Sequence, residues 1–287
     1  MATPNVTAFF NEATFTVTYV VADPESKKCV VIDPVLDYDA ASGRTSMASV
    51  ESVIDYIARS DLTLEWVLET HVHADHLTAA PQLKAQSRAI TAIGSHVTAV
   101  QSVFKGVFNL KDLVPDGSQF DHLFADGDEI QIGEIKGHVM HTPGHTPACL
   151  TYIFGDAAFV GDTLFMPDYG SARCDFPGGD AGTLYDSIQK IFALPDETRL
   201  FMCHDYKAPG RDKFAWETTV VEERENNIHI HAGVTREEFV SFRDGRDKQL
   251  SMPKLIIPSI QVNLRAGDLP PPEDNGVSYL KVPLDQL

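Results

Sequence analysis

Near its start the chain has two short runs of β-branched and aromatic residues, at 14–21 and 29–34, separated by a polar segment rich in turn formers. This pattern predicts two paired strands. In residues 46–60 the apolar positions recur three and four residues apart, which predicts a half-buried helix. A short apolar run at 64–68 predicts the next strand.

Strands and helices continue to alternate through most of the chain. Helical spacing is present at 77–86, 182–194 and 235–250, whereas 97–108 has a mixed pattern that fits neither element. Short apolar runs broken by Gly, Pro and Asp predict further strands at 90–93, 130–132, 137–141, 150–154, 158–160 and 200–203. Such alternation predicts an α/β fold with two sheets and helices packed outside them.

The last part of the chain differs in composition from the rest. Residues 253–287 are rich in proline, with prolines in a row at 270–272. We expect an extended tail that packs on the body or covers a neighbouring subunit, which favours a homodimer. The sequence therefore divides into a main domain at 1–234 and a C-terminal extension at 235–287, formed by a helix and the tail.

Charge and composition narrow the classes of partner. The formal net charge is −18, and such a field repels nucleic acid, so we expect no nucleic-acid partner. An anionic substrate would need a few local Lys or Arg residues. No run is apolar enough to span a bilayer and no signal-peptide pattern is present, so we expect no membrane partner and a cytoplasmic location. The four cysteines form no CxxC pair and are predicted to be reduced thiols, with Cys203 next to a histidine motif.

The segment HVHADH at 71–76 concentrates side chains that bind metals. His71, His73 and Asp75 alternate, so an extended backbone would turn them to the same side. His76 is predicted to begin the following helix, which puts the run on a strand-to-helix loop, where catalytic groups collect. Imidazole and carboxylate together suit a first-row transition metal.

Further motifs follow apolar strands later in the chain: His145 in HTPGHTP, Asp162 in FVGDTLF and His204 in MCHDY. Each alone has an ordinary explanation, such as a turn with a solvated histidine or a helix cap. Together with HVHADH they support one another, because all of them supply metal-ligand groups at strand ends. The sequence therefore predicts a metalloenzyme.

The ordered motifs HxHxDH, PGHT, GDTLF and HDY resemble the signature of the metallo-β-lactamase superfamily over residues 14–206. This resemblance implies an αββα sandwich with the site at the sheet edges and makes residues 1–234 the catalytic domain. Asp33, in the segment VIDP, matches a family aspartate that supports the site from outside the ligand shell.

Two branches of the superfamily carry the same ligand-type residues. Glyoxalase II hydrolyses glutathione thioesters with two metal ions, whereas persulfide dioxygenases oxidise glutathione persulfide with O2 to sulfite and glutathione at one Fe(II). Ala74 within THVHADH, the pattern Arg173-x-Asp175-Phe176, and HDY in place of HEY favour the dioxygenase branch. The chain departs from that branch at Ala172, where glycine is common, and in its longer tail.

The dioxygenase resemblance implies one Fe(II) per chain bound by His71, His145 and Asp162, a ligand set that leaves room for a persulfide and O2 together. The remaining ligand-type residues would form an outer shell or a second metal site: His73, Asp75, His76 and His204. Of these, Asp75 and His204 are predicted to take part in catalysis. In the hydrolase alternative all seven residues bind two Zn(II)-type ions, which activate a water molecule.

Arg173 and Tyr206 are the predicted substrate residues. Arg173 offers a forked donor to a glutathione carboxylate. Tyr206 matches a family tyrosine that contacts glutathione, and it is also predicted to be catalytic. The alternatives are an ion pair between Arg173 and Asp175, and a core role for Tyr206. A third function, a non-catalytic metal-binding regulator or persulfide sensor, fits less well, because purely structural metal sites are closed.

Overall fold

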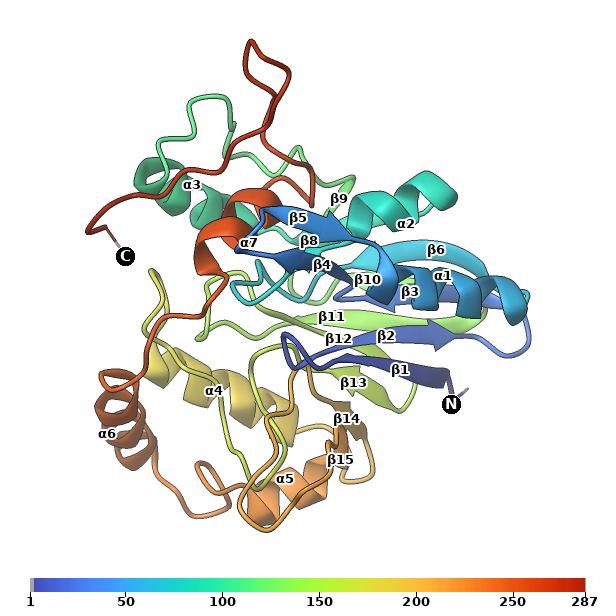
Figure 1. The fold of residues 1–287 in the computed structure, drawn as a ribbon. Helices are drawn as coiled ribbons and strands as arrows, with labels where there is room; N and C mark the ends of the chain where they lie inside the picture. Colours follow the sequence, from blue (N-terminus) through green and yellow to red (C-terminus); the bar gives the residue numbers. More distant parts are fainter. Residues whose placement is uncertain (1–2, 287) are drawn as a thin grey trace.

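The computed structural model of the chain describes residues 3–286. Two six-stranded sheets face each other, and helices cover their outer sides (Figure 1). In spatial order the first sheet contains β1 (Asn5–Asn11), β2 (Thr16–Ala22), β3 (Lys28–Ile32), β6 (Thr63–Leu68), β8 (Ile90–Gly94) and β9 (His122–Phe124). The second contains β10 (Glu129–Ile132), β11 (Ile135–His141), β12 (Leu150–Phe154), β13 (Ala157–Phe159), β14 (Arg199–Phe201) and β15 (Glu217–Thr219). This arrangement confirms the predicted αββα fold class.

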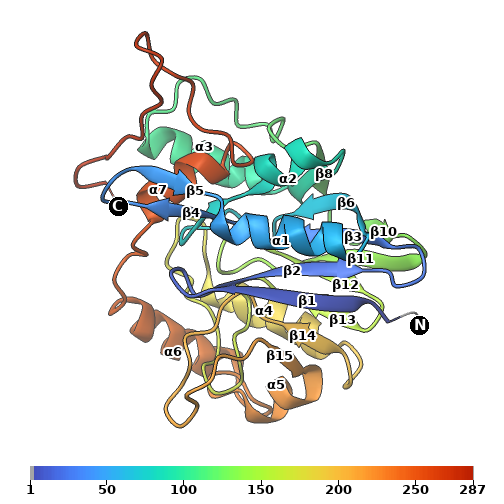
Figure 2. The same ribbon diagram turned by 45° about the vertical axis from the view of Figure 1, so that its right-hand side comes forward.

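The helices are divided between the two outer faces of the sandwich, as Figure 2 shows. On the side of the first sheet lie α1 (Ala48–Arg59), α2 (Ala80–Gln86), α3 (Val97–Val107) and α7 (Ile256–Asn263). On the side of the second lie α4 (Ala181–Phe192), α5 (Val220–Asn226) and α6 (Arg236–Asp247). The segment with the mixed pattern is therefore helical, as α3. Across residues 3–286 we find no helix with the length and apolar character needed to cross a membrane.

The apolar strands are buried on both faces, which explains their nearly continuous hydrophobic sequences. In β2, Val17, Tyr19 and Val21 point into the core between the two sheets, where Tyr19 packs edge-on against Phe159 of the second sheet. The alternate residue Val20 lies in the cluster beneath α1 and α2. The two sheets thus share one core, and each sheet forms another with its own helices.

A small third sheet adjoins the end of the histidine run. It contains β4 (Val35–Asp39), β5 (Arg44–Ser46) and β7 (Leu77–Thr78), with β4 in the centre. The prediction that the helix begins at His76 was wrong, because the next two residues pair with β4 and α2 begins only at Ala80. His76 consequently lies in the loop between β6 and β7.

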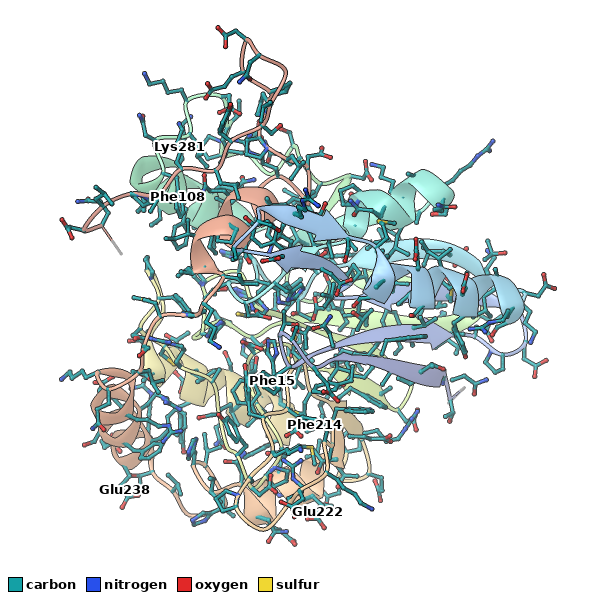
Figure 3. The ribbon with its side chains drawn as sticks, in the orientation of Figure 1. Phe15, Phe108, Phe214, Glu222, Glu238 and Lys281 are labelled. Atoms are coloured by element: carbon teal, nitrogen blue, oxygen red, sulfur yellow. The ribbon has the colours of Figure 1, made fainter. Side chains whose placement is uncertain are left out.

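The prediction of an extended tail was wrong for residues 256–263, which form the buried helix α7. Pro258 lies in the first turn of this helix, where the missing N–H needs no partner. The segment 268–286 does lack helix and strand. The Lys281 ammonium donates to the carbonyl oxygen of Asn109 at 2.6 Å, and Figure 3 shows Lys281 close to Phe108 at the end of α3.

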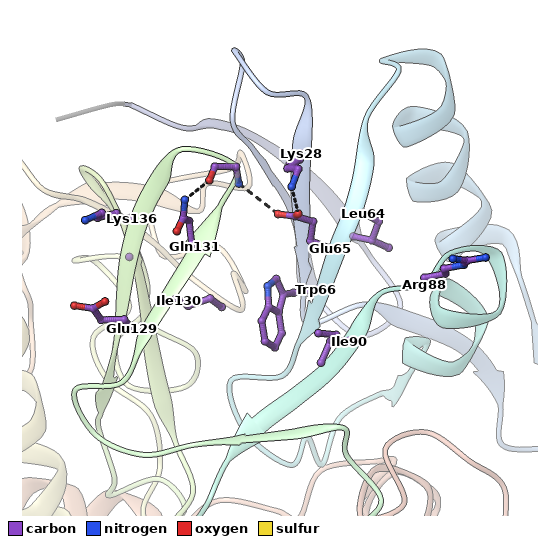
Figure 4. Close-up of a pocket in the computed structure, with 12 residues that line it drawn as sticks. Lys28, Leu64, Glu65, Trp66, Arg88, Ile90, Glu129, Ile130, Gln131 and Lys136 are labelled. Carbon is purple, nitrogen blue, oxygen red and sulfur yellow. Dashed lines mark hydrogen bonds and ion pairs between the residues drawn. The ribbon is translucent and has the colours of Figure 1, made fainter.

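A cleft of about 780 Å³ lies between the sheets at the end where β3, β6 and β8 begin. Figure 4 shows Trp66 and Ile130 on its two sides. Lys28 pairs with Glu65 at 2.6 Å, and the Gly133 amide donates to the other Glu65 oxygen at 3.3 Å. These contacts tie the two sheets together at this end, whereas the metal-ligand motifs follow the opposite ends of the strands.

Candidate metal centre

The histidine run lies in the loop between β6 and β7, with all of its imidazoles buried. Helix α7 holds the backbone of this loop. The Asn263 side-chain amide donates to the carbonyl oxygens of His73 at 2.9 Å and His76 at 2.8 Å, and its oxygen accepts from the Thr78 amide at 2.9 Å. Sequence reasoning missed Asn263, because it is 190 positions from His73 in a segment that was predicted to be extended.

Asp33 supports the loop from the end of β3. It has a left-handed backbone with φ 51°, which aspartate tolerates better than most residues. Its carboxylate accepts from the Thr70 amide at 2.7 Å and from the Thr70 hydroxyl at 2.8 Å, and lies 2.9 Å from His73 Nε2. Asp33 therefore fixes both the start of the loop and the direction of the His73 ring from behind the site.

His71, His145 and Asp162 come together at one point. Asp162 Oδ2 lies 3.6 Å from His145 Nε2 and 3.9 Å from His71 Nε2. Two ligand atoms that each lie about 2.1 Å from one ion are at most about 4.2 Å apart, so these spacings fit a shared metal. His71 Nε2 and Asp162 Oδ1 are buried and have no hydrogen-bond partner within residues 3–286, which is unusual unless an ion takes that place.

Backbone carbonyls fix the direction of two imidazoles. His145 Nδ1 lies 2.7 Å from the carbonyl oxygen of Arg173, and His204 Nδ1 lies 3.1 Å from that of Phe15. Because a carbonyl oxygen only accepts, Nδ1 of each ring carries a proton, and Nε2 is the nitrogen of each ring that is directed at the site. Burial lowers the pKa of both His71 and His145, so these two rings are neutral, as metal binding requires.

A second group of ligand-type residues centres on Asp75. Asp75 Oδ2 lies 2.9 Å from His76 Nδ1 and 3.6 Å from His204 Nε2, and it accepts from the Thr16 hydroxyl at 2.9 Å. His204 Nε2 also lies 3.4 Å from Asp162 Oδ1, so Asp162 stands between the two groups. Burial alone would lower the pKa of His204, but the carboxylates of Asp162 and Asp75 outweigh it and raise the pKa to about 9.

His73 makes different contacts from the other histidines. Its Nε2 lies 2.9 Å from Asp33 Oδ1 and 3.4 Å from Glu69 Oε2, whereas its Nδ1 faces the second group without a hydrogen-bond partner in the described part of the chain. Burial opposes protonation, yet these two carboxylates raise the pKa of His73 well above its usual value. Nearby, the Cys203 Sγ lies 3.5 Å from Asp33 Oδ2. All four cysteines are buried and unpaired, as predicted.

A cleft of about 970 Å³ opens over both groups of ligand-type residues. One wall is aromatic: the Tyr206 ring lies 5.4 Å from Phe15, 5.2 Å from Tyr169 and 6.0 Å from Phe165 between centroids. Tyr206 is 38% exposed and borders the cleft, so it is not the core aromatic of the alternative interpretation.

Arg173 also borders this cleft, but its guanidinium is already engaged. It donates to both Asp175 oxygens at 2.6 Å and to the carbonyl oxygen of Ser251 at 2.7 Å. The ion pair that the sequence left open as an alternative is thus present. Arg246 and Lys254 border the same cleft, and neither forms an ion pair within residues 3–286.

The fold, the motif order and the convergence of ligand atoms define one class of protein: the chain belongs to the metallo-β-lactamase superfamily. The model of that family matches residues 12–204. The chain is 54% identical to a probable metallo-hydrolase of Burkholderia pseudomallei, over 98% of this chain and 99% of that relative. It is 49% identical to glyoxylase B2 of Dictyostelium discoideum, over 93% and 92% of the two chains.

Other similarities point to a different activity. The chain is 32% identical to the mitochondrial persulfide dioxygenase ETHE1 of Bos taurus, over 92% of this chain and 89% of that relative. The crystal structure of ETHE1 from Myxococcus xanthus matches with a TM-score of 0.74 and 31% identity, covering 92% of this chain and 100% of the other. The chain spans 66% of the length of a beta-lactamase hydrolase-like protein of Xylella fastidiosa, to which it is 53% identical. Family membership therefore defines a metalloenzyme, and the relatives' names divide between hydrolase and dioxygenase.

Proposed function

We propose that this protein is a persulfide dioxygenase with one Fe(II) per chain and glutathione persulfide as its substrate. In the balanced reaction, the persulfide anion, O2 and one water give glutathione, sulfite and one proton. The outer sulfur is oxidised and the S–S bond breaks, while O2 is reduced and supplies two of the three sulfite oxygens. The ETHE1 likeness and the motifs around Arg173 and Tyr206 support this branch.

The convergence of His71, His145 and Asp162 is the observation that carries the proposal. His73 is not part of this group: its Nε2 is directed at Asp33 and Glu69, and its Nδ1 faces the second group around Asp75. The group that converges consists of two imidazoles and one carboxylate. A ferrous ion held by such a set keeps coordination positions open for a sulfur donor and for O2.

The protein's own residues would receive and orient the substrate. Glutathione persulfide carries two carboxylates, and the unpaired cations Arg246 and Lys254 in the cleft would attract them. Tyr206 would contact the tripeptide beside the metal ligands. Asp75, held by the Thr16 hydroxyl, would keep the imidazole of His204 directed at the reacting groups.

A glyoxalase II-type thioester hydrolase is the second candidate. His73 Nδ1, Asp75 and His76 also lie close enough to hold an ion, which would give a site with two Zn(II)-type ions. The names of the relatives that are 49% and 54% identical favour hydrolysis.

Metal analysis combined with two substrates separates these candidates. We expect protein purified without added metal to contain close to one iron per chain and little zinc. It should consume O2 with glutathione persulfide, release sulfite, and turn over S-lactoylglutathione poorly. His145→Ala is the matched control that lacks the metal. Two zinc ions per chain together with rapid hydrolysis of S-lactoylglutathione would instead establish the hydrolase.

A further inference from the structure

One peptide group connects a candidate metal ligand to helix α6. The carbonyl oxygen of Arg173 accepts from His145 Nδ1 at 2.7 Å, and the N–H of the same peptide belongs to Cys174. That N–H donates to Asp247 Oδ2 at 2.8 Å. Because a trans peptide is planar, its N–H and C=O point in opposite directions. The peptide is therefore held at both ends, by a carboxylate on α6 and by the imidazole of His145.

Arg243 fixes the carboxylate at the end of this connection. Its Nε and Nη2 donate to Asp247 Oδ1 at 3.0 and 2.7 Å. Its Nη1 donates to the carbonyl oxygen of Ser171 at 3.0 Å, so it also holds the segment that precedes Arg173. The side chains of Arg243 and Asp247 are 1% and 5% exposed.

The backbone around this segment leaves little freedom. The Ser171 amide donates to His229 Nδ1 at 2.9 Å. Gly170 has φ +102°, and a Cβ there would lie 2.2 Å from the His229 ring, so only glycine fits. Apart from His145, the side chains named here that hold the segment from Gly170 to Cys174 come from residues beyond the family-model match at 12–204: His229, Arg243 and Asp247.

A buried ion pair is a weak source of stability, because desolvation of both charges offsets their attraction. Groups that hold the second nitrogen of a metal-binding histidine orient the ring and raise its basicity. We propose that Asp247, fixed by Arg243, is a positioning residue for the metal centre and acts on His145 through the 173–174 peptide. This inference rests on the metal centre proposed above, and it applies equally to the dioxygenase and to the hydrolase.

Cobalt(II) titration of the metal-free protein tests the proposal, because its visible absorption reports ligand geometry and the titration gives a Kd without any turnover. We expect Asp247→Asn to weaken Co(II) binding about tenfold and to change the absorption bands, the low end of the range for outer partners of metal ligands. The matched control is Arg236→Gln. Arg236 also lies on α6, and its exposed ion pair with Asp186 at 3.3 Å is removed by this change. Both the Co(II) Kd and the absorption bands should stay unchanged.

A second variant protects the test against misfolding. Arg243→Met combined with Asp247→Leu removes both charges together, so it leaves no unpaired buried charge and should fold. We expect it to keep a cooperative thermal transition while Co(II) binding weakens as in Asp247→Asn. If both proteins fold and bind Co(II) with wild-type affinity and spectrum, Asp247 is only a structural residue and the proposal is wrong.

The same titration separates this inference from the proposed metal centre. Wild-type protein should bind Co(II), and His145→Ala should bind it far more weakly. Equal binding by these two proteins would overturn the metal centre itself. If His145→Ala loses Co(II) binding as expected and the Asp247 variants lose none, only the positioning role of Asp247 is overturned.

Discussion

The ligand-type side chains differ in how much of their hydrogen-bonding capacity the protein already uses. His73 contacts Asp33 through Nε2 and leaves Nδ1 without a partner in the described residues, whereas His71 leaves Nε2 without one. Asp162 is the one carboxylate of the proposed set, and it lies within 4 Å of both His71 and His145. These differences are the basis for proposing separate roles for residues that look equivalent in the motif.

The roles can be separated by two substitutions. Asp162→Ala should abolish iron binding and activity together, because it removes the only carboxylate of the set. His204→Ala should leave iron bound while activity falls about 10–100-fold, the usual cost of losing an outer partner. Iron content by elemental analysis and O2 uptake on the same samples check both. An empty site in His204→Ala would mean that His204 is a ligand and that the proposed set is wrong.

Arg246 and Arg173 both border the cleft and are candidates for the carboxylate receptor. We expect Arg246→Ala to raise KM with little change in kcat, because a remote carboxylate contact stabilises ground state and transition state alike. The loss in kcat/KM should be about 1.5–3 kcal/mol, as for a hydrogen bond to a charged group. Arg173→Ala should mainly lower the thermal unfolding temperature, because Arg173 already holds Asp175 and Ser251. A rise in KM with unchanged stability in Arg173→Ala would restore Arg173 as the substrate residue.

Helices α6 and α7 reach back to the metal centre from the end of the chain. Asp247 of α6 holds the peptide behind His145, and Asn263 of α7 holds the carbonyls of the histidine loop. Each helix therefore places one polar side chain behind a ligand-bearing loop. The C-terminal extension is consequently part of the site's architecture.

Asn263→Ala should destabilise the protein and loosen the site. It removes three hydrogen bonds to the loop and leaves buried backbone groups without partners, so we expect a loss of about 2–4 kcal/mol in the free energy of unfolding. Urea unfolding of the metal-free protein measures this loss. Gln261→Ala is a control on the same helix. Among residues 3–286 the Gln261 side chain bonds only to Ile257 and Lys281, so its loss should leave metal affinity unchanged. Unaltered metal affinity in Asn263→Ala would show that α7 does not shape the centre.

The entire protein carries a net charge of −18, which opposes the approach of an anionic substrate. Salt shortens the range of this repulsion from about 30 Å at 0.01 M to about 10 Å at 0.1 M. We therefore expect kcat/KM for glutathione persulfide to rise several-fold over this range while kcat stays constant. A persulfide with esterified carboxylates should show no such rise. A fall in kcat/KM with salt would instead mean that Arg246 and Lys254 dominate the approach.

Local pattern predicted much of the fold, because strand and helix periodicities are properties of short segments. It identified β2, β3, β6 and α1 and the strand-end positions of the ligand-type motifs. It failed at α7, because the proline-rich composition of this segment predicted an extended chain. The helix is stabilised by burial of its apolar face against α3 and the loops beside it. It also failed at β7, whose two residues are a strand only because β4 pairs with them.

The ligand-type residues could be found from sequence because each motif concentrates chemically distinctive side chains within a few positions. The partners that orient them could not be found in this way. Asn263 is 190 residues from the carbonyl of His73, and Asp247 is 73 residues from the amide of Cys174. The engagement of Arg173 depends on where Ser251 lies after α6. Hydrogen bonds of this kind depend on the tertiary fold, which brings residues that are distant in the sequence together. The residue pattern within a single segment therefore cannot predict them.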